Sequence, residues 1–221
     1  MELVSIAAES DSPVILLGET GCGKGVLARW IHEHSDRSNA PFVEVNCSSL
    51  KGELLASELF GHVRGAFTGA VQDKQGLIEV AGGGTLFLDE IADMDLSVQA
   101  QFLKVIEEKQ FRRVGEVKLR KSDFRLICAT NREILEETRQ GRFRKDLYFR
   151  INVLTIEIPP LRKRREDIPG LVEHLLTNLG APDIEVSPEA MQLLQDYPWP
   201  GNIRELRNVL ERAILLSRGI K

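Results

Sequence analysis

Apolar residues in the first two thirds of the chain form two alternating patterns, short continuous runs and longer amphipathic stretches. The continuous runs are typical of buried parallel strands, and they cover residues 14–17, 42–45, 86–88, 125–129 and 153–158. Between several of these runs the apolar spacing is helical, as in residues 98–108, where Phe102, Val105 and Ile106 share a face. Strands alternating with helices predict an α/β fold with a mostly parallel sheet covered on both faces.

The last third of the chain has a different pattern. Pro159 and Pro160 end the alternation, and a charged stretch follows at residues 162–167. Beyond it the apolar spacing is helical in three segments, residues 168–179, 188–197 and 202–217. We therefore expect two domains, a parallel-sheet αβα sandwich over residues 1–160 and a small all-helical lid over residues 161–221.

Composition narrows the classes of function. With 221 residues, 43% of them apolar, the chain is long enough for a substantial core. A net charge of -4 provides no general attraction to nucleic acid or anionic membranes. The three cysteines form no CxxC pair, and no apolar run reaches membrane-spanning length. We expect a cytoplasmic protein.

A glycine-rich segment between the first strand and the first amphipathic helix has the pattern of a phosphate-binding loop. Its glycines let the backbone curl so that several N–H groups face one anion, while Lys24 reaches the β- and γ-phosphates. The position after the lysine, usually Ser or Thr, is Gly25, so no hydroxyl is available there for Mg²⁺. The alternative is a turn in a protein that binds no nucleotide. The candidate nucleotide-binding residues are Gly18, Glu19, Thr20, Gly21, Cys22, Gly23, Lys24, Gly25 and Val26.

Two carboxylates follow the apolar run at residues 86–88. Ligands of open α/β sheets bind at the carboxyl ends of the strands, where Asp89 and Glu90 are expected to lie. Asp89 is a candidate Mg²⁺ ligand, and Glu90 is a candidate base that polarises the attacking water. The alternative is a solvated acidic turn.

Two asparagines and an arginine are weaker candidates. Asn131 follows the fourth strand and is placed to hydrogen-bond the γ-phosphate or the water, while Asn46 follows the second strand and is placed to hold Glu90. Asparagine at a strand end is also a common turn former. Asn202 and Glu205 have the spacing of a helix N-cap with its return bond. Arg204 then lies in the first helical turn, where its charge opposes the helix dipole and favours a nearby anion.

Two further arginines, Arg144 and Arg150, lie in a charged segment at residues 141–150. Their charge pattern alone favours surface ion pairs with Asp146 or Glu137.

Six stretches of the sequence together resemble the AAA+ domain of bacterial enhancer-binding proteins, the sigma-54-dependent transcription activators of the nitrogen-regulation type. The resemblance covers essentially the whole chain. Its most specific part is the run Gly65-Ala66-Phe67-Thr68-Gly69-Ala70, which matches the family signature at every position. The other stretches are residues 58–62, 83–90, 129–132, 160–162 and 199–206.

The resemblance implies a P-loop ATPase with ATP and Mg²⁺ as cofactors. Lys24 matches the P-loop lysine, and Asp89 and Glu90 match the metal-binding and water-activating pair. Asn46 matches an asparagine that switches the catalytic glutamate with nucleotide state. In addition, Asn131 falls in the sensor I motif, Arg204 in sensor II, and Arg144 and Arg150 match arginine fingers that reach a neighbouring subunit's ATP.

The resemblance also implies partners. Residues 65–70 match a loop whose tip, Phe67 and Thr68, touches sigma-54 of the RNA polymerase holoenzyme, and residues 110–121 fall where the family has a second hairpin beside that loop. Members work as rings, hexameric or occasionally heptameric, and remodel the holoenzyme so that the open complex forms. Gly65 and Gly69 provide hinges that tolerate positive φ. An apolar Phe67 between them indicates a partner, or else a ring packed under a tight hairpin.

Two features depart from the family. Gly25 stands where the family often has an acidic residue. The family's short adenine-seating motif, expected upstream of the first helix, is missing, since the chain starts inside that region. We expect DNA binding only through a domain absent from this chain, because no helix-turn-helix pattern is present. Two alternatives stay open, another AAA+ machine such as an unfoldase or DNA translocase, and a scaffold that binds ATP without hydrolysing it.

Overall fold

The computed structural model describes residues 2–219 and divides into two compact units. The sheet unit comprises residues 2–17 and 24–157, and the helical unit comprises residues 18–23 and 158–219. Residues 18–23, the glycine-rich loop, group with the helical unit. The domain boundary expected at residue 160 stays a prediction. The two expected domains include residues 1, 220 and 221, which lie outside the described residues.

The sheet unit contains a five-stranded parallel sheet in the order β2-β5-β8-β1-β9. This sheet, with helices packed against it, confirms the predicted α/β class. Each predicted strand is present, with its ends shifted by at most two residues. The strands are β1 (Val14–Leu17), β2 (Phe42–Asn46), β5 (Thr85–Asp89), β8 (Arg125–Thr130) and β9 (Leu154–Glu157).

The continuous apolar runs follow from the position of the central strands. Every residue of β8 is buried, and Leu86, Phe87 and Leu88 of β5 are fully buried. Strands covered on both faces need apolar side chains on both, which removes the alternation seen in half-exposed strands. The helices of this unit are α1 (Glu2–Glu9), α2 (Lys24–Glu33), α3 (Glu53–Phe60), α4 (Leu77–Val80), α5 (Leu96–Glu108), α6 (Ile134–Arg139) and α7 (Lys145–Ile151).

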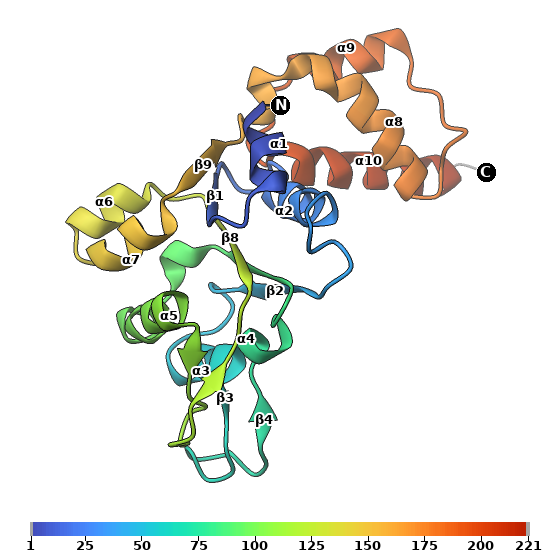
Figure 1. Ribbon diagram of the computed structural model, residues 1–221. Helices are drawn as coiled ribbons and strands as arrows, with labels where there is room; N and C mark the ends of the chain where they lie inside the picture. The colour runs from blue at the N-terminus through green and yellow to red at the C-terminus, as the bar shows by residue number, and fades with distance from the viewer. Residues whose placement is uncertain (1, 220–221) are drawn as a thin grey trace. The chain divides into compact units, whose positions relative to one another are not determined.

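Two short hairpins belong to the sheet unit. In the first, β3 (Gly61–His62) pairs antiparallel with β4 (Lys74–Gln75), as Figure 1 shows. In the second, β6 (Gln110–Phe111) pairs antiparallel with β7 (Arg120–Lys121), at the position predicted for a hairpin. The two hairpins are joined, because Val63 N–H donates to Val114 O (3.1 Å) and Val114 N–H donates to Gly61 O (2.9 Å).

The helical unit contains α8 (Ile168–Asn178), α9 (Pro188–Asp196) and α10 (Asn202–Gly219), drawn in orange and red in Figure 1. Its core is separate from that of the sheet unit and is centred on Trp199, whose indole N–H donates to Leu194 O (2.6 Å). The helical lid predicted from the apolar spacing is therefore present. Within residues 2–219 no helix is both long and apolar enough to cross a membrane.

Candidate nucleotide-binding and hydrolysis site

The carboxyl ends of three neighbouring strands bring the candidate polar residues of the sheet unit together. Asn46 ends β2 in register with Asp89, which ends β5, and Asn131 follows β8 on the other side of β5. Cys47 N–H extends the β2–β5 pairing by donating to Asp89 O (2.9 Å). The parallel order of the sheet therefore gathers residues that lie up to 85 positions apart in the sequence.

Glu90 lies at the centre of this group. Its Oε1 lies 3.4 Å from Nζ of Lys24, the buried first residue of α2, and its Oε2 accepts the N–H of Asn131 (3.0 Å). The backbone of Glu90 is left-handed, with φ 52° and ψ 49°. For a residue with a side chain this conformation costs of order 1–3 kcal/mol, and such strain is often found at active sites.

The electrostatics of this edge are unbalanced towards negative charge. Burial and the adjacent Glu90 raise the pKa of Asp89, while Lys24 opposes the shift. Burial, together with Asp89, Asp93 and Glu90, raises the pKa of the Cys47 thiol to about 12. Burial is the largest cause of both shifts, and the neighbouring carboxylates add to it.

The chemistry of the donors fits Mg²⁺ together with a nucleotide. No group of three or more His, Cys, Asp or Glu residues placed to hold a metal occurs in the described part of the chain. Mg²⁺ commonly takes one or two carboxylates and completes its shell with water and substrate phosphates. Asp89 can supply the protein ligand of that arrangement.

Steric crowding does not explain why position 25 is a glycine. A Cβ at this position would lie 3.8 Å from Cε1 of Phe87, which is ordinary van der Waals contact. A Cβ is therefore sterically accepted at this position, and Val26 beside it is largely exposed.

The predicted contact between Asn46 and Glu90 is not made in this conformation. Asn46 Oδ1 instead accepts hydrogen bonds from Ser48 N–H (2.9 Å) and Ser48 Oγ (2.7 Å), as expected for a turn-forming asparagine at a strand end. No hydrogen bond joins Asn46 to Glu90 among residues 2–219. Its role as a switch stays a prediction.

The glycine-rich loop adopts backbone conformations that require glycine. Gly21 and Gly23 have φ of 80° and 106°, and a Cβ on Gly21 would lie 2.5 Å from Gly201 O. Glu19 accepts two hydrogen bonds from Arg162 (2.6 and 2.8 Å), and Arg162 together with Asn202 lowers the pKa of Glu19 to about 2. The loop is thus held by side chains from its own helical unit.

The predicted N-cap role of Asn202 is wrong. Asn202 is buried and left-handed (φ 53°), and its side chain accepts from Leu161 N–H (2.8 Å) and donates to Glu19 Oε2 and Thr20 O (3.1 Å each). The Asn202 N–H donates to Trp199 O (2.9 Å), and the return bond of Glu205 goes to Gly201 N–H (2.8 Å) instead. Sequence reasoning missed Asn202 as an anchor of the loop, since its spacing to Glu205 imitates a capping box.

Arg204 lies in the first turn of α10, as predicted. It is exposed, and a Cβ on Gly21 would lie 3.0 Å from its Cβ. Arg204 is therefore beside the glycine-rich loop within the helical unit. Its contact with a phosphate stays a prediction.

The two candidate arginine fingers belong to the α7 segment. Arg144 precedes the helix, and its guanidinium forms a bidentate pair with Asp146 (3.0 and 2.6 Å), the ion pair that the charge pattern favoured. Arg150 is exposed and lines a cavity of about 170 Å³ with Lys109, Phe124 and Val153 among its other walls. Within residues 2–219 no hydrogen bond or ion pair joins either arginine to Glu90, and their role as arginine fingers stays a prediction.

The run from Gly65 to Ala70 is a compact turn between β3 and β4. Gly65 and Gly69 have φ of 81° and 102°, which confirms that both hinges use positive φ. Gly65 N–H donates to Ala70 O (2.8 Å), and Ala70 N–H donates to Phe67 O (3.0 Å). Phe67 is half-buried, with its ring against that of His62, so the packed alternative describes this conformation.

Comparison with known families matches nearly the whole chain to two models. Residues 1–157 match the family described as "Sigma-54 interaction domain", and residues 162–221 match "AAA+ ATPase lid domain". Among curated relatives, the response regulator protein PilR of Pseudomonas aeruginosa is 49% identical over 95% of the chain. A Nif-specific regulatory protein of Herbaspirillum seropedicae is 50% identical over 96% of the chain, and limonene hydroxylase of Geobacillus stearothermophilus is 54% identical over 98%.

The chain spans less than half the length of these relatives, 48% of PilR, 40% of the Nif-specific regulator and 41% of limonene hydroxylase. Among solved structures, NtrX of Brucella abortus in complex with ADP superposes with a TM-score of 0.90 at 38% identity, over 100% of this chain and 50% of that one. The complex of NtrX with ATP gives 0.89 at 39% identity, over 100% of this chain and 51% of that one.

Proposed function

The chain belongs to the sigma-54 interaction domain family, and we propose that it hydrolyses ATP and uses the energy to remodel sigma-54 RNA polymerase holoenzyme. The active form in this proposal is a ring, hexameric or heptameric, and its output is open-complex formation. The observation that carries the proposal is the group of Lys24, Glu90 and Asn131 at the carboxyl ends of the strands, in the unit that also presents residues 65–70.

Each residue of the group has a role in this proposal. Glu90 takes a proton from the attacking water, and the backbone N–H of Asn131 orients its carboxylate. Asp89, beside it, holds Mg²⁺ directly or through water. Lys24 supplies positive charge from the start of α2, where the helix dipole adds to it. When bound, ATP with Mg²⁺ supplies the γ-phosphoryl group that the water attacks.

The loop at residues 65–70 supports the choice of partner. Thr68 and both glycines are exposed, so this side of the loop is accessible to another protein, whereas Phe67 is half-buried. We do not extend the name limonene hydroxylase to this chain, because a glycine-rich loop that leads into Lys24, together with an Asp-Glu pair, is suited to phosphoryl chemistry. The match to that relative also covers 41% of its length.

Phosphate release measured against protein concentration tests hydrolysis and ring formation together. Activity should rise more than linearly with concentration, because each site is completed by a neighbouring copy. Full activity in a strictly monomeric preparation would refute the ring, and nucleotide binding without any turnover would favour a sensing scaffold. Retention of sigma-54 in the presence of ADP and aluminium fluoride, and not of ADP alone, tests the partner.

Substitutions at the loop tip separate hydrolysis from output. Phe67→Ala or Thr68→Ala should keep ATP turnover within a few-fold of the parent, since neither residue lies among the groups around Glu90. Loss of an apolar anchor typically costs about 2 kcal/mol or more, enough to remove a weak complex. Sigma-54 retention and open-complex formation should therefore fail. Parallel loss of ATPase and remodelling would instead make the loop a structural support of the site.

A further inference from the structure

His62 contacts the tip of the loop from below. It is buried at the end of β3, and its Nδ1 is hydrogen-bonded to Oγ of Ser57, which is also buried on α3, at 2.7 Å. The ring of Phe67 meets the imidazole edge to face, with the two centroids 5.0 Å apart and the planes at 68°. This arrangement is the preferred geometry for two aromatic rings.

The two glycines that flank the Phe67 segment are not packed against other residues. A Cβ built on Gly65 or Gly69 would meet no atom within 4 Å, so neither hinge is enclosed by the described residues. By contrast, Phe67 in the middle is half-buried. The ring contact with His62 thus adds a side-chain anchor to the two backbone hydrogen bonds that close the turn.

Both hairpins hold His62 in place. His62 forms a parallel bridge with Val114, in the turn of the second hairpin. The next residue, Gly115, lies so close to the loop that a Cβ there would be 2.8 Å from Cβ of Ala66. The dock is therefore rigid on the side of β3, whereas the segment that carries Phe67 is bounded by two glycines.

We propose that His62, oriented by Ser57, is the docking site that stores the Phe67 ring when the loop is not engaged with its partner. His62 is a positioning residue in this proposal, which rests on the proposed function. The contact withholds the apolar tip from sigma-54, and release of the ring makes it available. Ser57 belongs to α3 and His62 to β3, so the dock joins two elements of the sheet unit.

Hydrogen–deuterium exchange on the chain without nucleotide tests the dock. In His62→Ala the amides of residues 65–70 should exchange about two- to tenfold faster, the range expected for loss of one aromatic pair. Ser57→Ala, which keeps the imidazole but frees its orientation, should give a smaller acceleration in the same segment. The matched control is His174→Ala, an exposed histidine of α8 in the helical unit, and residues 85–89 of the core strand β5 are the internal reference.

The same variants are then tested for sigma-54 retention in ADP alone, where His62→Ala should retain two- to tenfold more than the parent. Unchanged exchange at residues 65–70 overturns the proposal. So does faster exchange that includes residues 85–89, which would show that His62 supports the fold as a whole. Retention that falls in every nucleotide state also overturns it.

The exchange measurement needs neither hydrolysis nor partner. A parent chain without ATPase activity would therefore refute the proposed function and leave the dock standing. Intact ATPase with unchanged loop exchange would refute the dock alone.

Discussion

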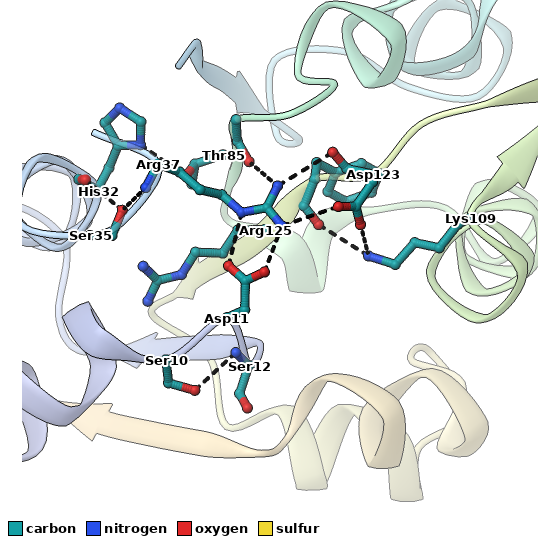
Figure 2. A network of polar contacts seen from close by, with 12 residues as sticks. Ser10, Asp11, Ser12, His32, Ser35, Arg37, Thr85, Lys109, Asp123 and Arg125 are labelled. Carbon is teal, nitrogen blue, oxygen red and sulfur yellow. Dashed lines mark hydrogen bonds and ion pairs between the residues drawn. The ribbon is translucent and has the colours of Figure 1, made fainter. Parts of the chain in front are cut away.

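The charged side chains at the two ends of the central strands are paired to different degrees. At the amino ends, Figure 2 shows Arg37 between two carboxylates, donating to both oxygens of Asp11 (2.9 and 2.6 Å) and to Asp123 (3.2 Å). Lys109 reaches Asp123 from α5 at 2.9 Å. The hydrogen bond with Arg37 lowers the pKa of Asp11, and that with Lys109 lowers the pKa of Asp123. Every charge of this network has a partner.

At the carboxyl ends the carboxylates are poorly compensated. Asp89 and Glu90 are consecutive, Lys24 is the cation beside them, and the pKa of Asp89 is raised. At the amino end Arg37, Lys109, Asp11 and Asp123 are paired with one another, although the buried Arg125 Nε has no hydrogen-bond partner in the described residues. At the carboxyl end the consecutive Asp89 and Glu90 share the half-buried position beside Lys24. From this difference we infer that the amino end stabilises the fold and that the carboxyl end binds a ligand. In the proposed function, Mg²⁺ and an arginine of a neighbouring subunit supply the positive charge at the second end.

The largest expected effect concerns that external arginine. Arg144→Ala should reduce ATP turnover by about 10³–10⁵-fold, the contribution typical of an arginine finger. Mixing Arg144→Ala chains with inactive Lys24→Ala chains should restore part of the turnover. A mixed interface pairs an intact nucleotide site with an intact finger. Phosphate release across a series of mixing ratios measures the restoration.

Asp146 provides the matched control, because it holds Arg144 within the same chain. Asp146→Asn frees the guanidinium without removing it, so its turnover should stay far above that of Arg144→Ala. Absence of any restoration in the mixtures, with rings shown to form, would place Arg144 in a role within its own subunit.

The second effect concerns Glu90. Glu90→Gln should lower hydrolysis by about 10²–10⁴-fold, the usual contribution of a general base, while ATP binding persists. Single-turnover hydrolysis together with nucleotide titration separates the two steps. Near-parental turnover would remove Glu90 from the mechanism and would make the unbalanced end of the sheet unrelated to catalysis.

The sequence predicts the carboxyl end of the sheet well and the amino end hardly at all. Asp89, Asn46 and Asn131 each follow an apolar run, and parallel strands bring such positions to one edge. Arg37 and Asp123 carry no such signal, because charged residues before a strand look like solvated loop. Their pairing across 86 positions depends on the sheet order, which local patterns do not encode.

The same limit explains the errors near the glycine-rich loop. The spacing of Asn202 and Glu205 imitates a capping box, but burial of Asn202 against Leu161 and Thr20 redirects its side chain. Likewise, the side chain of Asn46 finds a nearer partner in Ser48 than in Glu90. Short-range spacing identifies which residues are polar and placed at an element's end, and tertiary packing decides what they bind.

The third effect concerns Arg125, the buried cation at the amino end. It begins β8 and donates to the carbonyls of Ala7 and Ala8, the last buried residues of α1. Arg125→Ala leaves both carbonyls without that donor and opens a cavity. Unfolding free energy should fall on the order of 2–4 kcal/mol, as measured by urea denaturation. Turnover per folded molecule should change little.

Asp89→Asn is the opposing test at the carboxyl end. Because the pKa of Asp89 is raised, its charged form is less favourable in the folded state than in the unfolded chain. The substitution should leave stability unchanged or slightly higher while hydrolysis is lost. A clear loss of stability in Asp89→Asn would show that this carboxylate supports the fold, and the contrast between the two ends would fail.

The smallest effect is the pH dependence of the Arg37 network. The pKa of Asp123 is lowered, so its contribution to stability is present above its unfolded value near 3.8 and is lost as the pH falls through the folded value below it. The Asp123 side chain is 64% exposed, so solvent screening limits the contribution to less than about 1 kcal/mol. Asp123→Asn should therefore be slightly destabilised at neutral pH, and its difference from the parent should vanish once the pH is below the lowered folded pKa of Asp123. For Asp89→Asn the sign reverses, and any gain in stability at neutral pH should shrink as the pH falls through the folded pKa of Asp89, which lies above 3.8.

Urea titrations of both variants between neutral pH and about pH 3 measure the two trends. Trends of the same sign would mean that the two ends of the sheet do not differ in electrostatic strain.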